Sequence, residues 1–232
     1  MKQRVLRIVE PLCLIVVPFA MLLCVYLNVP NSAVVTAVIA GVALIPFFLD
    51  FEWSHIRARD LMPIVVMSAL GVAGRIVFAP LPAIKPVTAI VIVTAMSFGR
   101  QSGFFTGILC ALVSNIFFGQ GPWTPWQMYA WGTIGYITGT LATTGIFERH
   151  KWFIYVYGVL MSYFYGGLLD AWTYIGFVQP WTLETAAVTF GGGAIYNLGH
   201  ALGTALFLVP IAGSWSRKFE RVKRKYGIGS ND

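Results

Sequence analysis

Charged side chains are scarce in this chain of 232 residues. They make up 11% of it, with only nine aspartates and glutamates, while hydrophobic residues make up 57%. A water-soluble domain carries about 25% charged residues, so this composition excludes that class and favours an all-α integral membrane protein. The net charge of +7 comes from basic residues in short loops and at the two ends, so we expect no nucleic-acid partner.

Cysteine is also sparse, and signatures of catalysis are missing. Cys13, Cys24 and Cys110 lie in apolar stretches, and the first two are separated by about 16 Å along one helix, too far for a disulfide. The chain has no phosphate loop, no Gly-x-Ser-x-Gly turn and no His-Glu-x-x-His run. We therefore expect no enzyme activity, no cofactor and no metal site.

Long apolar runs fill almost the whole chain. A spanning helix needs about 20 mostly apolar residues, and eight windows of that kind can be placed. They cover residues 9–27, 32–49, 61–78, 86–98, 103–118, 126–147, 152–177 and 185–212. The fourth is short, which predicts a steep or partly re-entrant segment. The first lacks a small-x-small cleavage site, so we expect it to be retained.

The basic residues predict the topology. With the amino terminus inside, the lysines and arginines fall on the cytoplasmic side except for Lys85, which lies outside, and Arg75, which lies within a span. Eight spans with both termini cytoplasmic are therefore expected. The basic segment 217–225 is expected to lie near anionic lipid as a tail, with a short interfacial helix permitted.

Polar residues at membrane depth are functional candidates. Arg75 and Asp170 both belong to the outer leaflet, where they either pair with each other, contact a ligand, or do both. On the seventh span Tyr163, Gly167, Asp170 and Tyr174 share one helical stripe, which predicts a face turned toward protein or ligand.

Asn197 and His200 lie three residues apart near the middle of the last span, and we expect a hydrogen-bonded interior pair rather than a metal site, with His200 on the inner half of the helix, away from the pocket mouth.

Tryptophans gather near the predicted outer face. Trp181 is expected in an interfacial belt, where Trp131 and Trp172 also fall, while Trp123 and Trp126, bracketed by prolines, are expected to wall a pocket. The predicted substrate-binding residues are Arg75, Lys85, Asn115, Gln120, Trp123, Trp126, Gln127, Tyr163, Asp170, Tyr174 and Asn197.

Small residues mark a further face. Ala69 and Ala73 form a stripe on the third span that points away from Arg75 and lets another helix approach closely. Glycines spaced by four, at 99, 103 and 107, at 135 and 139, and at 199 and 203, predict close packing within the bundle, while residues 191–193 form a local weak point.

These features together resemble the substrate-binding membrane subunit, the S component, of energy-coupling-factor (ECF) vitamin transporters. The resemblance rests on Ala69-x-x-x-Ala73, on Arg75 with the loop Pro80-Leu-Pro-Ala-Ile-Lys-Pro86, on the glycine-rich residues 98–107 and on residues 114–126. It implies a six-helix substrate-binding core at residues 61–212. The count of spans adds two transmembrane helices with a basic cytoplasmic loop at residues 1–60, and a basic cytoplasmic tail follows the core at residues 213–232.

The resemblance also implies a function in a bacterial cell membrane. Such a subunit captures a vitamin outside and delivers it with a transmembrane coupling subunit and two ATP-binding-cassette ATPases, and Ala69 and Ala73 would contact the coupling subunit. The Gly-Gln-Gly-Pro-Trp pattern favours cobalamin or its precursor, with riboflavin or a queuosine precursor as alternatives. An intramembrane enzyme built on Asp170, Asn197 and His200 is the competing class, followed by a stand-alone carrier.

Overall fold

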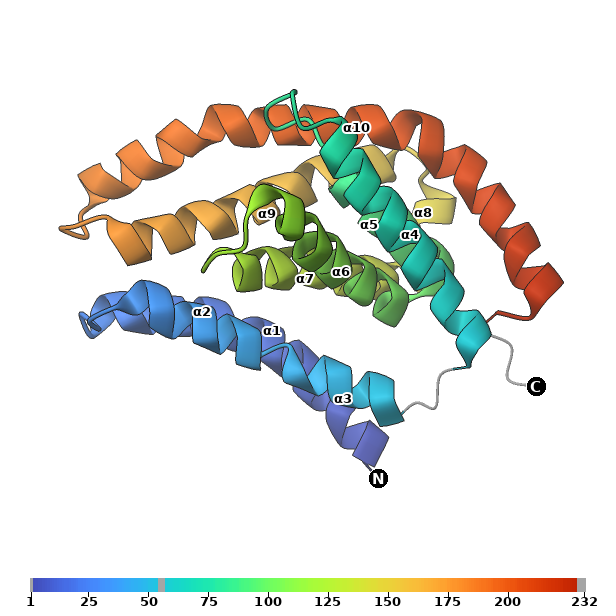
Figure 1. The fold of residues 1–232 in the computed structure, drawn as a ribbon, viewed down its shortest axis with the longest axis horizontal. Helices are drawn as coiled ribbons and strands as arrows, with labels where there is room; N and C mark the ends of the chain where they lie inside the picture. Colours follow the sequence, from blue (N-terminus) through green and yellow to red (C-terminus); the bar gives the residue numbers. More distant parts are fainter. Residues whose placement is uncertain (1, 54–56, 229–232) are drawn as a thin grey trace.

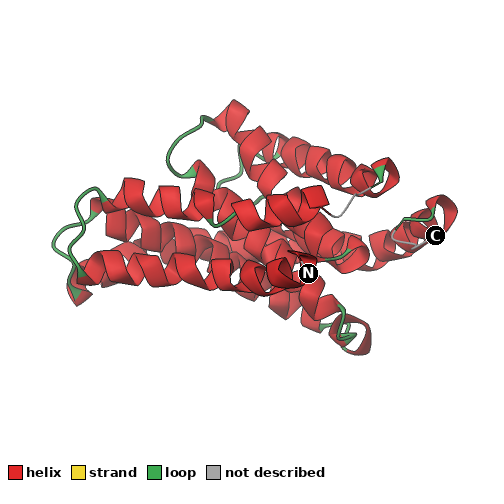
Figure 2. Cartoon of the chain, turned by 90° about the horizontal axis from the view of Figure 1, so that it is seen from below, coloured by secondary structure: helices red, strands yellow, loops and turns green. Residues whose placement is uncertain are grey.

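The structure, a computed structural model, describes residues 2–53 and 57–228, and within them every regular element is an α-helix (Figures 1 and 2). The helices are α1 (Lys2–Tyr26), α2 (Ser32–Val42), α3 (Ile45–Trp53), α4 (Ala58–Val77), α5 (Val87–Phe98), α6 (Arg100–Phe118), α7 (Thr124–Ala142), α8 (Ile146–Arg149), α9 (Phe153–Phe177) and α10 (Leu183–Tyr226). The expected all-helical membrane protein is confirmed.

Five segments of the described chain are long and apolar enough to cross a membrane. They are Val9–Tyr26, Ser32–Trp53, Ala58–Val77, Arg100–Phe118 and Leu183–Tyr226. The helices α7 and α9 coincide with two more of the eight predicted spans, and α5 is a shorter apolar helix. The count of eight and the cytoplasmic placement of both termini stay predictions.

The short helix α5 is the centre of the bundle. It packs against α4, α6, α7, α9 and α10, and ten of its twelve residues are buried. It is a regular α-helix, and its predicted steep or partly re-entrant course in the membrane stays a prediction. Twelve residues suffice at this place because protein surrounds the helix and leaves none of its backbone to lipid.

Glycines bring α6 and α7 into backbone contact, as their spacing predicts. A Cβ atom added to Gly135 would lie 2.2 Å from the carbonyl carbon of Gly103, and one added to Gly107 would lie 2.5 Å from the backbone of Trp131. No side chain fits at these crossings, so the predicted close packing is confirmed for this helix pair.

The N-terminal helices form a separate layer along one side of the bundle (blue in Figure 1). The predicted second span is in fact two helices, α2 and α3, which meet at a turn at residues 43–44 just before Pro46. Proline at the second position of α3 fits because a first-turn N–H has no intrahelical acceptor. The layer contacts the core chiefly through α7 and α9.

The last helix is much longer than its predicted span. α10 runs through residues 191–193 and Pro210 to Tyr226, 44 residues or about 66 Å, and ends at Gly227 with φ 59°. The helix is uninterrupted at residues 191–193, and the basic residues 217–225 continue α10 rather than forming a separate tail helix. The predicted sixth span is shorter than expected, because α7 ends at Ala142 and Gly145, with φ 71°, precedes α8.

Candidate functional site

The side chain of Arg75, in the last turn of α4, joins α4 to the end of α6. Its guanidinium donates to the Ser114 hydroxyl and, at 2.8 Å, to the amide oxygen of Asn115. The rings of Phe118 and Trp131 lie 4.9 Å and 5.2 Å from it, within cation–π range. The arginine is therefore held by two polar groups and two aromatic rings.

Asn115 extends this polar group across the following loop to α7. Its amide nitrogen donates to the hydroxyl of Thr124 at 2.9 Å and to the side-chain oxygen of Gln127 at 2.8 Å. The Thr124 hydroxyl donates in turn to Gln120 at 2.9 Å. Arg75, Asn115, Gln120 and Gln127, predicted separately from the sequence, therefore belong to one network, which we call the Arg75 network together with Ser114 and Thr124.

Trp123 and Trp126 border this network differently. Trp123 is 39% exposed and its ring lies over Gly121, where a Cβ atom would come within 2.5 Å of it. Trp126 is fully buried beside Tyr129, and its indole N–H has no hydrogen-bond partner. Trp126 lies with Tyr129 on the stripe of α7 that meets α1, as the bond from Tyr129 to the Leu14 carbonyl shows.

Lys85 caps the end of α4. Its ammonium donates to the carbonyls of Phe78, Ala79 and Leu81, the last at 2.6 Å, so the loop 79–86 folds back over the helix terminus. Burial lowers the pKa of Lys85, and the positive charge of Arg75 lowers it further. The side chain thus has a structural role, and its predicted contact with a ligand stays a prediction.

A second group of polar contacts, made by Trp131, Thr88 and His200, lies next to this loop. The indole N–H of Trp131 donates to the Thr88 hydroxyl at 3.0 Å, which lies 3.0 Å from Nε2 of His200. The ring of Tyr165 stacks on Trp131 at 4.4 Å and meets His200 edge-on at 5.0 Å. Trp131 also touches Arg75, so the two polar groups are continuous.

The contacts of Trp131 and His200 correct two predictions. Trp131 is 2% exposed and belongs to the core, not to an interfacial belt, and Trp172 is buried too. His200 lies beside Thr88 in the first turn of α5, and the neighbouring Gly199 and Gly203 pack against loop residues 83 and 84. The histidine therefore lies under the same loop as Arg75, whereas the sequence predicted it away from the pocket mouth.

Asp170 and Asn197 form a separate contact between α9 and α10. The Asn197 amide donates to Asp170 at 2.7 Å. The alternative in which Arg75 and Asp170 pair is therefore wrong, as is the hydrogen-bonded pair of Asn197 and His200, because each of these side chains has a different partner.

The remaining members of the α9 stripe lie outside the Arg75 network. Tyr163 is 40% exposed, and Tyr174 donates its hydroxyl to the Thr182 carbonyl at 2.9 Å. The structure does not bring this stripe together with Arg75.

The alanine stripe is exposed on the outer face of α4. Ala69 and Ala73 lie there with Val65 and Val66. Met62 and Val66 on the same helix also line an apolar cavity of about 280 Å³, which Phe98, Phe219 and Val222 close from α5 and α10. This cavity lies at the opposite end of α4 from Arg75.

Sequence reasoning missed Ser114, Thr88 and Tyr165, and it assigned Trp131 to the wrong environment. Hydroxyl groups within a span can bond to the backbone of their own helix, so they give no distinctive pattern. Ser114, for example, bonds to the carbonyl of Cys110 as well as to Arg75.

Comparison with family models matches residues 55–212 to the S component of ECF-type riboflavin transporters. The match covers more than half of the chain, which therefore belongs to this family of membrane substrate-binding subunits. Comparison with curated proteins and with solved structures found no match.

Membership in the family decides several predictions. The S-component identification is confirmed, and the chain is a binding subunit for transport rather than an enzyme. An S component works with a vitamin substrate and an energy-coupling module, so these partners follow as classes. The preference for cobalamin is not supported, because the matching family is of the riboflavin type, which was one of the alternatives.

Proposed function

We propose that this S component captures riboflavin or a closely related flavin at the Arg75 network. The observation that carries the proposal is the riboflavin-type family match across the core, which includes every residue of the network. A flavin has a flat tricyclic ring with hydrogen-bond donors and acceptors along one edge and a polyhydroxyl side chain. Aromatic faces and amide side chains are the groups that bind such a molecule.

The chemistry of the network supports this ligand class. Arg75 offers donors, while the amides of Asn115 and Gln127 offer both donors and acceptors. The rings of Phe118, Trp131 and Tyr165 supply flat apolar surface beside them. Because these polar groups form hydrogen bonds with one another in the structure, a ligand has to replace some of those hydrogen bonds. The loops 79–86 and 119–123 are the segments that would move when it binds.

We place the network at the external face. The C-terminal end of α4 and the N-terminal ends of α5 and α7 meet there, whereas the ends that carry Arg59, Arg100 and Arg149 lie at the other end by chain direction. A basic end predicts the cytoplasm. Both termini then lie inside the cell.

The outer face of α4 is the proposed contact for the coupling subunit. Ala69 and Ala73 leave a flat exposed surface for another helix, and the apolar cavity beside Met62 and Val66 continues it toward the cytoplasmic end. The coupling subunit and the two ATPases would supply the energy.

A binding assay on the purified full chain tests the proposal. Riboflavin titrated against the protein should bind at one molecule per chain, with its fluorescence quenched by the neighbouring rings. Cobalamin and a queuosine precursor serve as competitors. Tight binding of either competitor with no binding of riboflavin would overturn the flavin assignment, and uptake by vesicles without added ATPase subunits would overturn the coupled mechanism.

A further inference from the structure

The apolar cavity of about 280 Å³ lies between the start of α4 and the end of α10, and we call it the α4–α10 cavity. In Figure 1 these are the cyan end of α4 and the red end of α10. Met62 and Val66 line it from α4, and Val222 lines it from α10. Phe98 and Phe219, whose rings lie 5.0 Å apart, form its wall toward α5.

The lining and the size of the cavity suit a hydrocarbon chain. Among the described residues that line it, only Arg59 and Tyr226 carry polar side-chain atoms. Apolar cavities of about 150 Å³ stay dry and bind small apolar molecules, and this one is larger. Met62 and Val66 are 61% and 48% exposed, so the cavity opens on the outer face of α4, where an apolar chain can enter from the bilayer.

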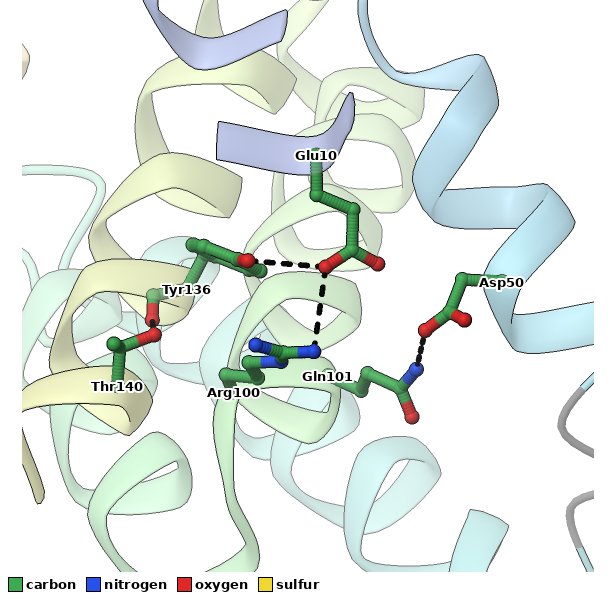
Figure 3. Close-up of polar contacts among 6 residues, drawn as sticks. All are labelled: Glu10, Asp50, Arg100, Gln101, Tyr136 and Thr140. Atoms are coloured by element: carbon green, nitrogen blue, oxygen red, sulfur yellow. Dashed lines mark hydrogen bonds and ion pairs between the residues drawn. The ribbon is translucent and has the colours of Figure 1, made fainter. Parts of the chain in front are cut away.

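The end of α10 that borders the cavity is strongly basic. Residues 217–225 contain six lysines and arginines and one acid, Glu220. Within the part of the chain that the structure describes, this segment forms one ion pair, between Glu220 and Lys223 at 3.0 Å. Arg100 differs, because it pairs with the buried Glu10 at 3.5 Å (Figure 3). Most of the positive charge of residues 217–225 is therefore not balanced by the described chain.

Apolar and basic side chains occupy different faces of this last part of α10. Phe219, Val222 and Tyr226 are spaced by three and four residues, so they share the face that lines the cavity. Lys225 lies at the rim, because its ammonium is 5.3 Å from the ring of Tyr226. A molecule that satisfies both features has a hydrocarbon chain and a negatively charged head.

We propose that the α4–α10 cavity binds an anionic phospholipid, with one acyl chain in the cavity and the phosphate at the basic end of α10 beside Lys225. Anionic lipids give the cytoplasmic leaflet a negative potential that attracts basic segments next to a span, and the proposed orientation puts this end of the bundle there. The site is at the opposite end of α4 from Arg75. With the chain in place, the filled cavity continues the outer face of α4 beside Ala69 and Ala73.

Native mass spectrometry of the purified full chain tests the lipid and its charge. The protein in neutral detergent is titrated with phosphatidylglycerol or with phosphatidylcholine that carries the same acyl chains. We expect one phosphatidylglycerol per chain to stay bound where phosphatidylcholine is lost. Lys225→Gln should weaken this binding about fivefold, the effect of one basic residue close to an anionic group. Lys151→Gln, at an exposed position outside the cavity lining, is the control and should bind as the wild type does.

Val66→Trp tests where the acyl chain lies. The indole takes up room in the cavity and should weaken phosphatidylglycerol binding at least about tenfold, as expected when two methylene groups are no longer buried. Val65→Trp adds the same bulk at the adjacent position, which is 60% exposed and outside the lining, and should keep the lipid. Thermal unfolding of both variants checks that they fold.

Three results would overturn the proposal. The first is equal retention of the two lipids, which would remove the role of the charge. The second is unchanged phosphatidylglycerol binding by Val66→Trp, which would leave the cavity to another occupant, such as a side chain of the coupling subunit. The third is a rise in melting temperature with inorganic phosphate as large as that with phosphatidylglycerol, which would indicate a site for free anions.

Discussion

The hydroxyl of Tyr129 donates to the backbone carbonyl of Leu14 at 2.5 Å, across the boundary between α7 and α1. Within a helix that carbonyl would accept from the N–H of residue 18, but residue 18 is proline and has none. Tyr129 thus satisfies a carbonyl that α1 cannot satisfy itself, and it does so from a side chain that is 1% exposed.

Tyr129→Phe should therefore lower the free energy of unfolding by about 1–3 kcal/mol, since a buried carbonyl loses its donor. In a Pro18→Ala background the N–H of residue 18 is available, and the same substitution should cost less than half as much. Thermal unfolding of the four proteins in the cycle measures this coupling. Tyr196→Phe, at a 55% exposed position, is the control; equal costs in both backgrounds would contradict the account.

Arg75→Lys should weaken flavin binding at least about tenfold, because an ammonium cannot reproduce the planar contacts that Arg75 makes with Ser114, Asn115 and the two rings. Fluorescence titration measures the dissociation constant. Arg149→Lys makes the same chemical change at the other end of the bundle, where the arginine binds the Thr144 carbonyl, and it should leave the constant unchanged. Equal affinity of both variants would place the ligand elsewhere.

Ala69→Leu and Ala73→Leu should abolish ATP-dependent uptake and leave flavin affinity intact, because both positions are exposed on the outer face of α4 and point away from the side chain of Arg75. The measurement is uptake by vesicles that contain the complete transporter, beside binding by the isolated chain. Ala187→Leu introduces the same bulk at an exposed position of α10 and should transport normally. Loss of binding in the α4 variants would reject the partner face.

Gly166→Ala and Gly167→Ala should differ sharply. A Cβ atom at Gly166 would lie 1.9 Å from the amide oxygen of Asn197 and displace the side chain that bonds Asp170, whereas Gly167 faces open space. We expect Gly166→Ala to cost about 1–3 kcal/mol and Gly167→Ala to be neutral or slightly stabilising. Thermal unfolding of the two variants measures this difference. Equal melting temperatures would argue against close packing of α9 on α10.

Much of the helical organisation is predictable from the sequence, because apolar runs of about 20 residues identify helices in a lipid-solvated chain. The glycines of α6 and α7 likewise predict the close crossing that the structure shows. Arg75 and Asn115 could be singled out since polar groups at that depth are rare.

The depth of His200 could not be predicted in this way. Hydropathy places a helix within about one bilayer thickness, but α10 is 44 residues long and extends well past the loop 79–86 on both sides. The level of any residue on it is set by what packs beside it. Only the contacts of Gly199 and Gly203 with that loop fix the histidine next to α5.

The contacts of Glu10 and Asp50 with the first turn of α6 were missed for another reason (Figure 3). Glu10 lies inside a predicted span and Asp50 follows one directly. Charged side chains are rare at such positions, and that rarity was the reason for selecting Arg75. Arg100 was treated only as an indicator of topology. Its pairing with a residue about 90 positions away depends on the packing of α1 against the core, which no local pattern contains.

The layer α1–α3 is attached to the core near both of its ends. At one end Arg100 holds Glu10, and at the other the Ser32 hydroxyl donates to the Ile175 carbonyl at 2.7 Å. A segment fastened at two such distant points cannot swing about either one without breaking a buried contact. If the core tilts in the bilayer during transport, these helices must travel with it as one rigid body, and the lipids along their outer edge must be displaced as well.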